Sequence, residues 1–517
     1  MKTILADWGF TARRSIGFVR TLFKSKMAIA GLIILILYSS LAIAAPLVTP
    51  FDPQTSIVSG AYAPPVWYNS FSEGTGLSQN QLLEQRQGFF SDPNSNGWTF
   101  TTSDSTHVRE AFDPTVSYGQ GSGSVRVTLD RSDGPFNGTF AGTFMKTFDW
   151  PYKGPPQRFS GTIVIKTPDG TSQQPVGATV FMERLADHRV WNLTDNSGVN
   201  NLSWASYPFT TNSWQVPRFL DSNDENVREV LHVTNIDPAE LIFSSPGQYA
   251  YGVTVTFASN VGPATPNPTA PLTAYLDEMN LRLYGSSWGL LGTDSQGLDI
   301  WSQLVYGARV SLTVGLLSAF IGIALGLLVG LVAGYLGKIV DEVLMRFTDM
   351  LLVIPGLPLL IVLVSVIGTS LGSSRLPVLI LVIGFLGWMG FARVVRAQVL
   401  SLKERPFVEA AKAAGAGTGH ITTRHIIPNI VGLIYVNLAL AVPGAILSEA
   451  ALSFLGLGDV TVMSWGRMLN LVEITGSQRT WWWVLPPGLS IALVSLAFVM
   501  IGFSLDTLFN PRLRQRR

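Results

Sequence analysis

Long apolar runs occupy both ends of the sequence and are missing from its middle. The first run, 27–48, is uncharged and long enough to cross a bilayer as a helix, which takes about 20 residues. Five further candidate spans follow residue 305, near 308–334, 350–368, 376–395, 429–452 and 483–505. This pattern predicts a mainly α-helical membrane protein with six transmembrane helices. A cleaved signal peptide is the alternative for the first run, although both that run and the polar stretch before it are long for one.

The middle of the chain, 63–291, shows period-two alternation instead of long apolar runs. Short alternating segments with turn residues between them are typical of strands, and they predict an all-β domain of the jelly-roll or sandwich kind. The clearest segments are SVRVTLD (124–130), GTIVIKT (161–167), ATVFMER (178–184), YGVTVTF (251–257) and YLDEMNLRLYG (275–285). The tryptophans of this domain either form its core or offer platforms for a ligand; they include Trp98, Trp150, Trp191, Trp204 and Trp214.

Charge separates the same regions. The middle carries 13 Lys and Arg against 21 Asp and Glu, whereas the remainder carries 22 against 13. With the N-terminus inside, six spans place 18 of those 22 basic residues on the cytoplasmic side, as the positive-inside rule requires. We therefore expect a cytoplasmic tail (1–26), a first helix (27–48), an extracellular β domain (63–291), a membrane core with five helices (292–507) and a basic cytoplasmic tail (508–517).

Composition excludes several kinds of chemistry. The sequence has no cysteine, and its five histidines are scattered without metal-ligand spacing, so we predict no disulfide, no metal site and no catalytic residue. No phosphate-binding loop of the form GxxxxGK[ST] occurs. The second span does carry a pattern, because small residues recur every fourth position and permit close helix packing. They are Ser318, Gly322, Gly326, Gly330 and Gly334.

A charged, alanine-rich segment, 405–428, separates two apolar runs. Pro406 suits the first turn of a helix, and Gly415 is placed as its left-handed stop. We expect a second helix that begins near Ile421 and ends before Pro428. The product is a helix–turn–helix at the cytoplasmic surface, which either docks on another protein or rests on anionic lipid. We call residues 405–428 the coupling segment.

This segment resembles the EAA loop of bacterial and archaeal ABC importer permeases. Glu409, Ala410, Ala411, Gly415 and Pro428 match the pattern, whereas His425 and Ile427 replace its isoleucine and leucine. Four further stretches resemble the dipeptide, oligopeptide and nickel subfamily, namely 292–312, 341–359, 446–458 and 510–514. Leu298 and Gln303 stand where that subfamily usually has arginine, so any salt bridge those arginines make is absent here.

The resemblance implies the fold of a type I ABC importer permease and the function of passing dipeptides or oligopeptides through the cytoplasmic membrane. Oligosaccharide and nickel carriers also belong to the subfamily, so the substrate stays open. Expected partners are two ATP-binding subunits, a second homologous permease subunit, an extracytoplasmic substrate-binding protein and membrane lipid, but no nucleic acid. ATP and Mg would be bound by the partner subunits and no cofactor by this chain, which is therefore not an enzyme. Glu409 and Gly415 would carry the contact with the ATPase.

The long insert departs from the family pattern, and no family function extends to it. Its last strand is similar to that of carbohydrate-binding-like jelly rolls, which leaves an alternative: a membrane-anchored envelope lectin or receptor. Three Asn-x-Ser/Thr sites lie in the insert, at Asn137, Asn192 and Asn201, where glycosylation is possible. Glu449, late in the fifth span, is a candidate for an outer gate, with helix capping as the simpler explanation.

Overall fold

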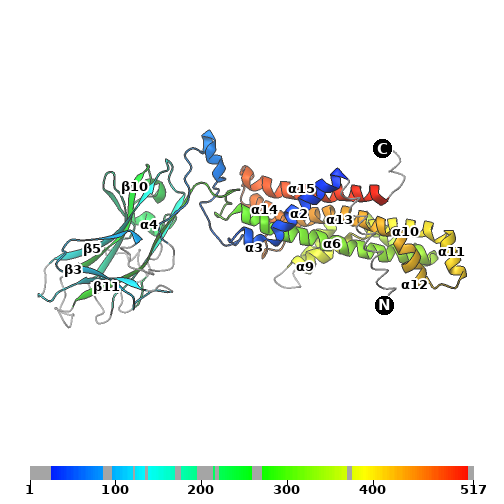
Figure 1. Ribbon diagram of the computed structural model, residues 1–517, viewed down its shortest axis with the longest axis horizontal. Coiled ribbons are helices and arrows are strands. Elements are labelled where there is room, and N and C mark those ends of the chain that lie inside the picture. The colour runs from blue at the N-terminus through cyan, green and yellow to red at the C-terminus, as the bar shows by residue number, and fades with distance from the viewer. Residues whose placement is uncertain are drawn as a thin grey trace, which may run out of the picture. The chain divides into compact units, whose positions relative to one another are not determined.

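The chain divides into a β-rich unit and a helical unit (Figure 1). The β unit is Ile57–Leu298, and the helical unit combines Met1–Ser56 with Asp299–Arg517. The computed structural model describes residues 25–84, 96–119, 123–133, 138–168, 176–194, 213–215, 220–258, 271–368 and 375–509. The two ends of the β unit are paired, because Ile57 forms a β-bridge with Leu298 and the Val58 N–H donates to the Gly297 carbonyl at 2.8 Å.

Two antiparallel sheets build the β unit. One has the strand order β3-β4-β11-β6-β9, with β1 paired to β11, and the other has the order β2-β5-β10-β7-β8. The strands are β1 (Gln81–Leu82), β2 (Trp98–Thr102), β3 (Val108–Asp113), β4 (Ser124–Leu129), β5 (Thr139–Trp150), β6 (Arg158–Lys166), β7 (Val176–Arg184), β8 (Arg189–Asn192), β9 (Leu220–Asp221), β10 (Gly247–Ala258) and β11 (Leu272–Tyr284). The five alternating segments of the sequence lie in β4, β6, β7, β10 and β11.

A single apolar core lies between the two sheets. In β10, alternate residues from Tyr249 to Phe257 point into this core and are fully buried, as the period of two requires. Trp98, Trp150 and Trp191 are core residues, Trp214 is half-buried, and Trp204 lies outside the described residues. Short helices complete the unit: η1 (Val66–Ser70), η2 (Ser72–Gly74), α4 (Glu225–Val230) and α5 (Pro238–Ile242).

The helical unit contains five helical stretches, among the described residues, that are long and apolar enough to cross a membrane. A bent pair of helices, α7 and α8, makes a sixth span if the pair is counted as one. The helices are α2 (Lys26–Ile43), α3 (Ala45–Val48), α6 (Ile300–Leu336), α7 (Lys338–Val353), α8 (Gly356–Gly368), α9 (Leu376–Leu386), α10 (Met389–Lys403), α11 (Pro406–Ala413), α12 (Thr418–Ile421), η4 (Thr422–Ile426), α13 (Ile427–Phe454), α14 (Trp465–Ile474) and α15 (Trp481–Phe509). These elements give a multi-pass membrane protein.

The expected third span, 350–368, is not one helix. α7 stops at Val353, and α8 leaves the break at an angle of 91°. Ile354 is extended (φ −71°, ψ 129°) because the ring of Pro355 disfavours the helical conformation in the residue before it. The first span is also shorter than expected, since α2 ends at Ile43 and Pro46 lies in the separate turn α3.

The small-residue stripe of α6 faces α9 and α10. A methyl group on Gly326 would lie 2.7 Å from the Trp388 carbonyl, and one on Gly330 would lie 2.6 Å from the Ala392 carbonyl. A methyl group on Gly334 would lie 2.8 Å from Val399, and one on Gly322 would lie 3.2 Å from the Gly384 carbonyl. Only glycine permits this approach of the backbones, which strengthens van der Waals packing where the hydrophobic effect between helices is missing.

Candidate functional site

Helix α11 opens the coupling segment at one end of the helical unit, directly after α10 (Figure 1). Arg405 is extended (φ −78°, ψ 143°), and Pro406 occupies the first turn, where its missing N–H leaves no helical bond unmade. The alanines that follow are the best helix formers. Glu409 lies in the first turn, where the helix dipole favours a carboxylate.

A Schellman motif ends α11. Gly415 has φ +81°, a left-handed backbone conformation that is energetically unfavourable for residues with a Cβ atom. Its N–H donates to the Lys412 carbonyl at 2.9 Å, and the Ala416 N–H donates to the Ala411 carbonyl at 3.0 Å. These two bonds define the motif and fix the turn between α11 and α12.

The second half of the coupling segment differs from the expectation of a helix that begins near Ile421 and ends before Pro428. α12 begins at Thr418, and the chain continues through the π-helical turn η4 into α13 without a stop. Pro428 has no N–H to donate, and its ring excludes a carbonyl four residues earlier. The π turn accommodates this proline, because the Ile427 N–H donates five residues back to the Thr422 carbonyl. The coupling segment is therefore continuous with α13.

Apolar anchors fix the inner face of the coupling segment. Val408, Ile421 and Ile426 are essentially fully buried. They belong to one cluster with Phe391 and Val399 of α10, and side chains of α6 and α13 complete it. The inner face of α11 and α12 therefore packs against α6, α10 and α13.

The predicted contact residues lie mostly on the open side of the segment. Glu409, Ala410, Gly415 and Pro428 are exposed, whereas Ala411 and His425 are half-buried. The His425 ring lies 6.3 Å from the ring of Phe407 and 5.9 Å from that of His420. The arrangement offers a small-residue surface with one carboxylate and a nearby aromatic cluster, and this suits docking of another protein.

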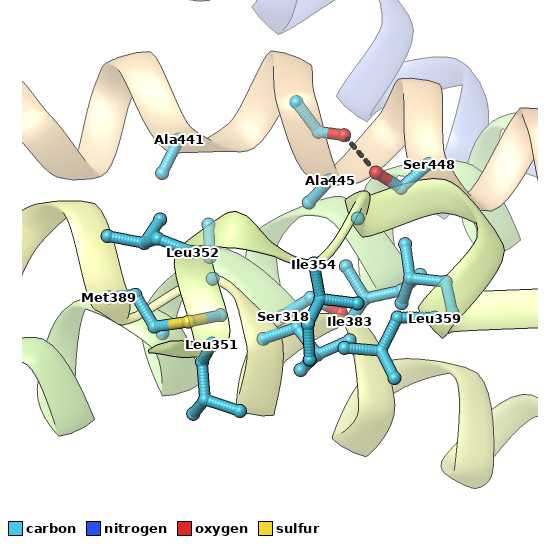
Figure 2. A pocket seen from close by; sticks show the side chains of 17 residues that line it. Ser318, Leu351, Leu352, Ile354, Leu359, Ile383, Met389, Ala441, Ala445 and Ser448 are labelled. Carbon is cyan, nitrogen blue, oxygen red and sulfur yellow. Dashed lines mark hydrogen bonds between the residues drawn. The ribbon is translucent and has the colours of Figure 1, made fainter. Parts of the chain in front are cut away.

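A cavity of about 390 Å³ lies in the helical unit at the break between α7 and α8 (Figure 2). Both sides of the break contribute to its wall, with Leu351, Leu352 and Ile354 before Pro355 and Leu359 after it. Ala441, Ala445 and Ser448 of α13 line the opposite side of the cavity in Figure 2.

The polar side chains in the wall of this cavity are directed at the backbone. The Ser448 hydroxyl donates to the Gly444 carbonyl at 2.8 Å, and the Ser318 hydroxyl donates to the Ile380 carbonyl at 3.1 Å. The described residues that line the cavity include no charged side chain. The wall is therefore apolar, and sequence patterns missed it because six helices contribute to it.

Glu449 is buried where α6, α13 and α14 meet, with 1% of its surface exposed. It accepts hydrogen bonds from the Ser453 hydroxyl at 2.7 Å and the Ser311 hydroxyl at 3.2 Å. Ser311 in turn accepts the Trp465 N–H at 3.4 Å. Its carboxylate therefore accepts hydrogen bonds from serine hydroxyls, and Glu449 does not line the cavity.

The remaining predicted residues are in the β unit. Asn192 is exposed at the end of β8, whereas Asn137 and Asn201 lie outside the described residues. The tails 1–24 and 510–517, with all their basic residues, also lie outside them. Within the described ranges, no group of three His, Asp or Glu side chains is arranged to hold a metal ion.

Two family models match the chain. "Binding-protein-dependent transport system inner membrane component" matches residues 326–515, and "N-terminal TM domain of oligopeptide transport permease C" matches residues 17–65. Neither model covers residues 66–325, which include nearly all of the β unit.

Relatives of the chain match it over somewhat more than 200 residues. The dipeptide transport system permease protein DppC of Bacillus subtilis is 38% identical over 250 residues, which is 48% of this chain and 76% of that protein. The oligopeptide transport system permease protein OppC of Haemophilus influenzae is 38% identical over 222 residues, or 43% and 70%. Among solved structures, an inward-facing MetNI methionine ABC transporter chain is 22% identical, covering 41% of this chain and 95% of its own, with a TM-score of 0.32.

Proposed function

Because the chain belongs to the family of binding-protein-dependent transport system inner membrane components, we propose that it passes dipeptides or oligopeptides across the cytoplasmic membrane as the permease subunit of an ABC importer. The names of its relatives support peptides over oligosaccharides or nickel. The family is a transporter family, so the helical unit is accounted for by transport and not by a lectin anchored in the membrane.

One observation carries the proposal: the coupling segment has a buried inner face and an open outer face. Val408 and Ile421 anchor it to α10 and its neighbours, while Glu409 and Ala410 are exposed. A partner that holds the outer face therefore moves the helices attached to the inner face. The resemblance to the EAA loop supports an ATP-binding subunit as this partner, with hydrolysis of ATP outside this chain.

The topology follows from charge. Basic residues concentrate in the N-terminal tail, around the coupling segment and at the C-terminus, and this supports a cytoplasmic position for all three. The β unit follows the first span and, with its acidic balance, belongs on the extracellular side. There it can meet the substrate-binding protein, whereas the helical unit pairs with a second permease subunit in the membrane.

The test is peptide uptake by the complete transporter in proteoliposomes, with ATP hydrolysis measured in parallel. Replacing Gly415 with proline removes the N–H that closes the Schellman motif, because proline has none to donate. Glu409→Ala removes the exposed carboxylate of the contact surface. Both variants should insert and hydrolyse ATP without importing peptide.

Gly417→Ala is the matched control, because Gly417 is exposed with φ −69° and a methyl group there meets nothing within 4 Å. It should import normally. Normal uptake by both Gly415→Pro and Glu409→Ala would overturn the proposal.

A further inference from the structure

Two ion pairs join α7 to α10. Arg396 of α10 holds the Asp341 carboxylate with two nitrogens, Nη2 lying 2.6 Å from Oδ2 and Nε bonding to Oδ1. Three residues earlier on α10, Arg393 pairs with Asp349 through Nη2. The pairing is antiparallel and spans most of α7. We call these two contacts the α7–α10 pairs.

The two α7–α10 pairs differ in their shielding from solvent. The side chains of Asp341 and Arg396 are 15% and 35% exposed, whereas those of Asp349 and Arg393 are 57% and 49% exposed. A planar guanidinium that holds a carboxylate with two nitrogens fixes orientation as well as distance. Ion pairs also strengthen as water is excluded. The Asp341–Arg396 pair is therefore the stronger connection.

Apolar contacts and one further hydrogen bond support the same connection. Leu351 of α7 packs against the cluster formed by Trp388 and by Met389 and Ala392 of α10. At the far end of α10, the Lys403 ammonium donates to the Gly334 carbonyl of α6 at 3.3 Å. Helix α10 is thus tied to both of its neighbours along its length.

The connected helices lead from the coupling segment to the cavity. α10 ends three residues before Pro406 and begins at Met389, which lines the cavity. α7 ends at the break, where Leu352 and Ile354 also line the cavity. While the α7–α10 pairs hold, a displacement of α10 by the coupling segment must also displace α7. The extended residue Ile354 is the point at which α7 can turn relative to α8.

We propose that Asp341, Arg396, Asp349 and Arg393 are positioning residues, which carry movement of the coupling segment to the α7–α8 break and so change the size of the cavity. This inference rests on the proposed function and adds a route between its two parts. It assigns a role to side chains that lie outside both the coupling segment and the wall of the cavity.

The chain supplies its own control. Glu342 and Arg346 form an ion pair of similar length, 2.7 Å, but both residues are on α7. Their side chains are 62% and 79% exposed, and the pair does not reach α10. Reversing one of these charges alters the charge of α7 without touching the connection.

The experiment uses the complete transporter in proteoliposomes and compares Arg396→Asp, Asp341→Arg and the double exchange of both. Peptide uptake per ATP hydrolysed is one readout. The other is the distance between spin labels at Ser401→Cys in α10 and Val362→Cys in α8, measured with and without trapped ATP. The sequence has no cysteine of its own, so both labels are specific within this chain.

Each single reversal at the stronger pair should lower uptake per ATP about tenfold and abolish the change in label distance, and the double exchange should restore both. Arg393→Asp should have a smaller effect, and Arg346→Glu should have none. Unchanged uptake and label movement in Arg396→Asp, or failure of the double exchange to restore either, would overturn the inference. An unmodified transporter that imports no peptide would contradict the proposed function instead.

Discussion

The β unit and the helical unit differ in how many large apolar side chains they expose. The β unit encloses its aromatic side chains, and Trp98, Trp150 and Tyr249 are essentially inaccessible. The helical unit turns its large apolar side chains outward, with Phe320 63% exposed and Val353 83% exposed. Its helix α6 approaches α9 and α10 through glycines. The difference is that of their solvents, since water drives apolar groups inward and lipid does not.

The comparison changes what counts as a functional signal. In the β unit, exposed apolar residues are few among those described, and buried charges mostly have partners. In the helical unit, exposed leucines need no explanation, whereas a buried carboxylate such as Glu449 or an ion pair between helices does. Substitutions should therefore affect the two units differently, according to whether they change a buried apolar side chain or a contact between helices.

The largest effect should come from Trp150→Ala in the β unit. Trp150 is fully buried, and its ring packs 5.2 Å from Phe243 and 5.0 Å from Tyr152. Truncating a buried tryptophan costs about 3–5 kcal/mol of unfolding free energy. Thermal unfolding should show earlier loss of the β unit with an unchanged transition of the helical unit. Trp67→Ala, at a side chain 43% exposed, is the control, and equal losses in both variants would contradict the core assignment.

The second-largest effect should come from Gly330→Leu, which overpacks the contact between α6 and α10. A Cβ at Gly330 already meets the Ala392 carbonyl and Val395 at 2.6 Å, so a leucine must separate α6 from α10. Overpacking costs about 1–3 kcal/mol, and here it should lower the temperature at which the detergent-solubilised helical unit aggregates. Gly390→Leu is matched, because no atom lies within 4 Å of a Cβ there. If both variants aggregated at the same temperature as the unmodified protein, the close contact at Gly330 would not contribute to the stability of the helical unit.

Gly415→Ala should have a smaller effect, confined to the coupling segment. A Cβ there meets no atom within 4 Å, so the cost is the left-handed conformation alone, about 1 kcal/mol. Uptake per ATP should fall a few-fold, and Gly415→Asn should fall less, because asparagine tolerates this conformation better. An asparagine variant worse than the alanine variant would show that side-chain volume, and not backbone conformation, limits this position.

The smallest effect is a pH dependence in the β unit. Hydrogen bonds from the Arg184 guanidinium, with Nε 2.9 Å from Oδ1, lower the pKa of Asp187 from 3.8 to about 2. A depressed pKa means that the charged form stabilises the fold above about pH 4 and that this contribution disappears as the pH falls to about 2. Asp187→Asn should therefore be less stable than the unmodified protein at neutral pH.

The measurement for Asp187 is chemical unfolding of the β unit at several pH values. The difference between Asp187→Asn and the unmodified chain should shrink between pH 4 and pH 2. Asp149→Asn, at an exposed strand position, is the control. A difference for Asp187→Asn that stays constant across this range would rule out the ion pair as its cause.

The sequence predicted those features that depend on a periodic pattern or on the backbone chemistry of a single proline or glycine. The glycines of α6, the start of α11 at Pro406 and the turn at Gly415 all follow from the chemistry of single residue types at regular positions. The break at Pro355 was overlooked because the apolar run continues across it. The π turn before Pro428 was missed for a similar reason, since a proline within a helix can be accommodated by a local change of hydrogen bonding.

The site beyond the coupling segment depends on contacts that periodicity does not encode. Asp341 and Arg396 are 55 positions apart, and each alone suggests only a charged residue near a membrane surface. The cavity is similar, because its wall combines unremarkable apolar residues from six helices. Only the fold brings these groups together.

Photo-crosslinking from the coupling segment tests the central claim most directly. Ala413→Cys, exposed at the end of α11, would carry a benzophenone label in the assembled transporter, with Ile33→Cys on the outer face of α2 as the control. We predict that the label at 413 crosslinks to an ATP-binding subunit and that the label at 33 crosslinks to lipid. If the label at 413 crosslinked only to lipid while the ATP-binding subunits were present, the segment would rest on the membrane and the coupling account would be wrong.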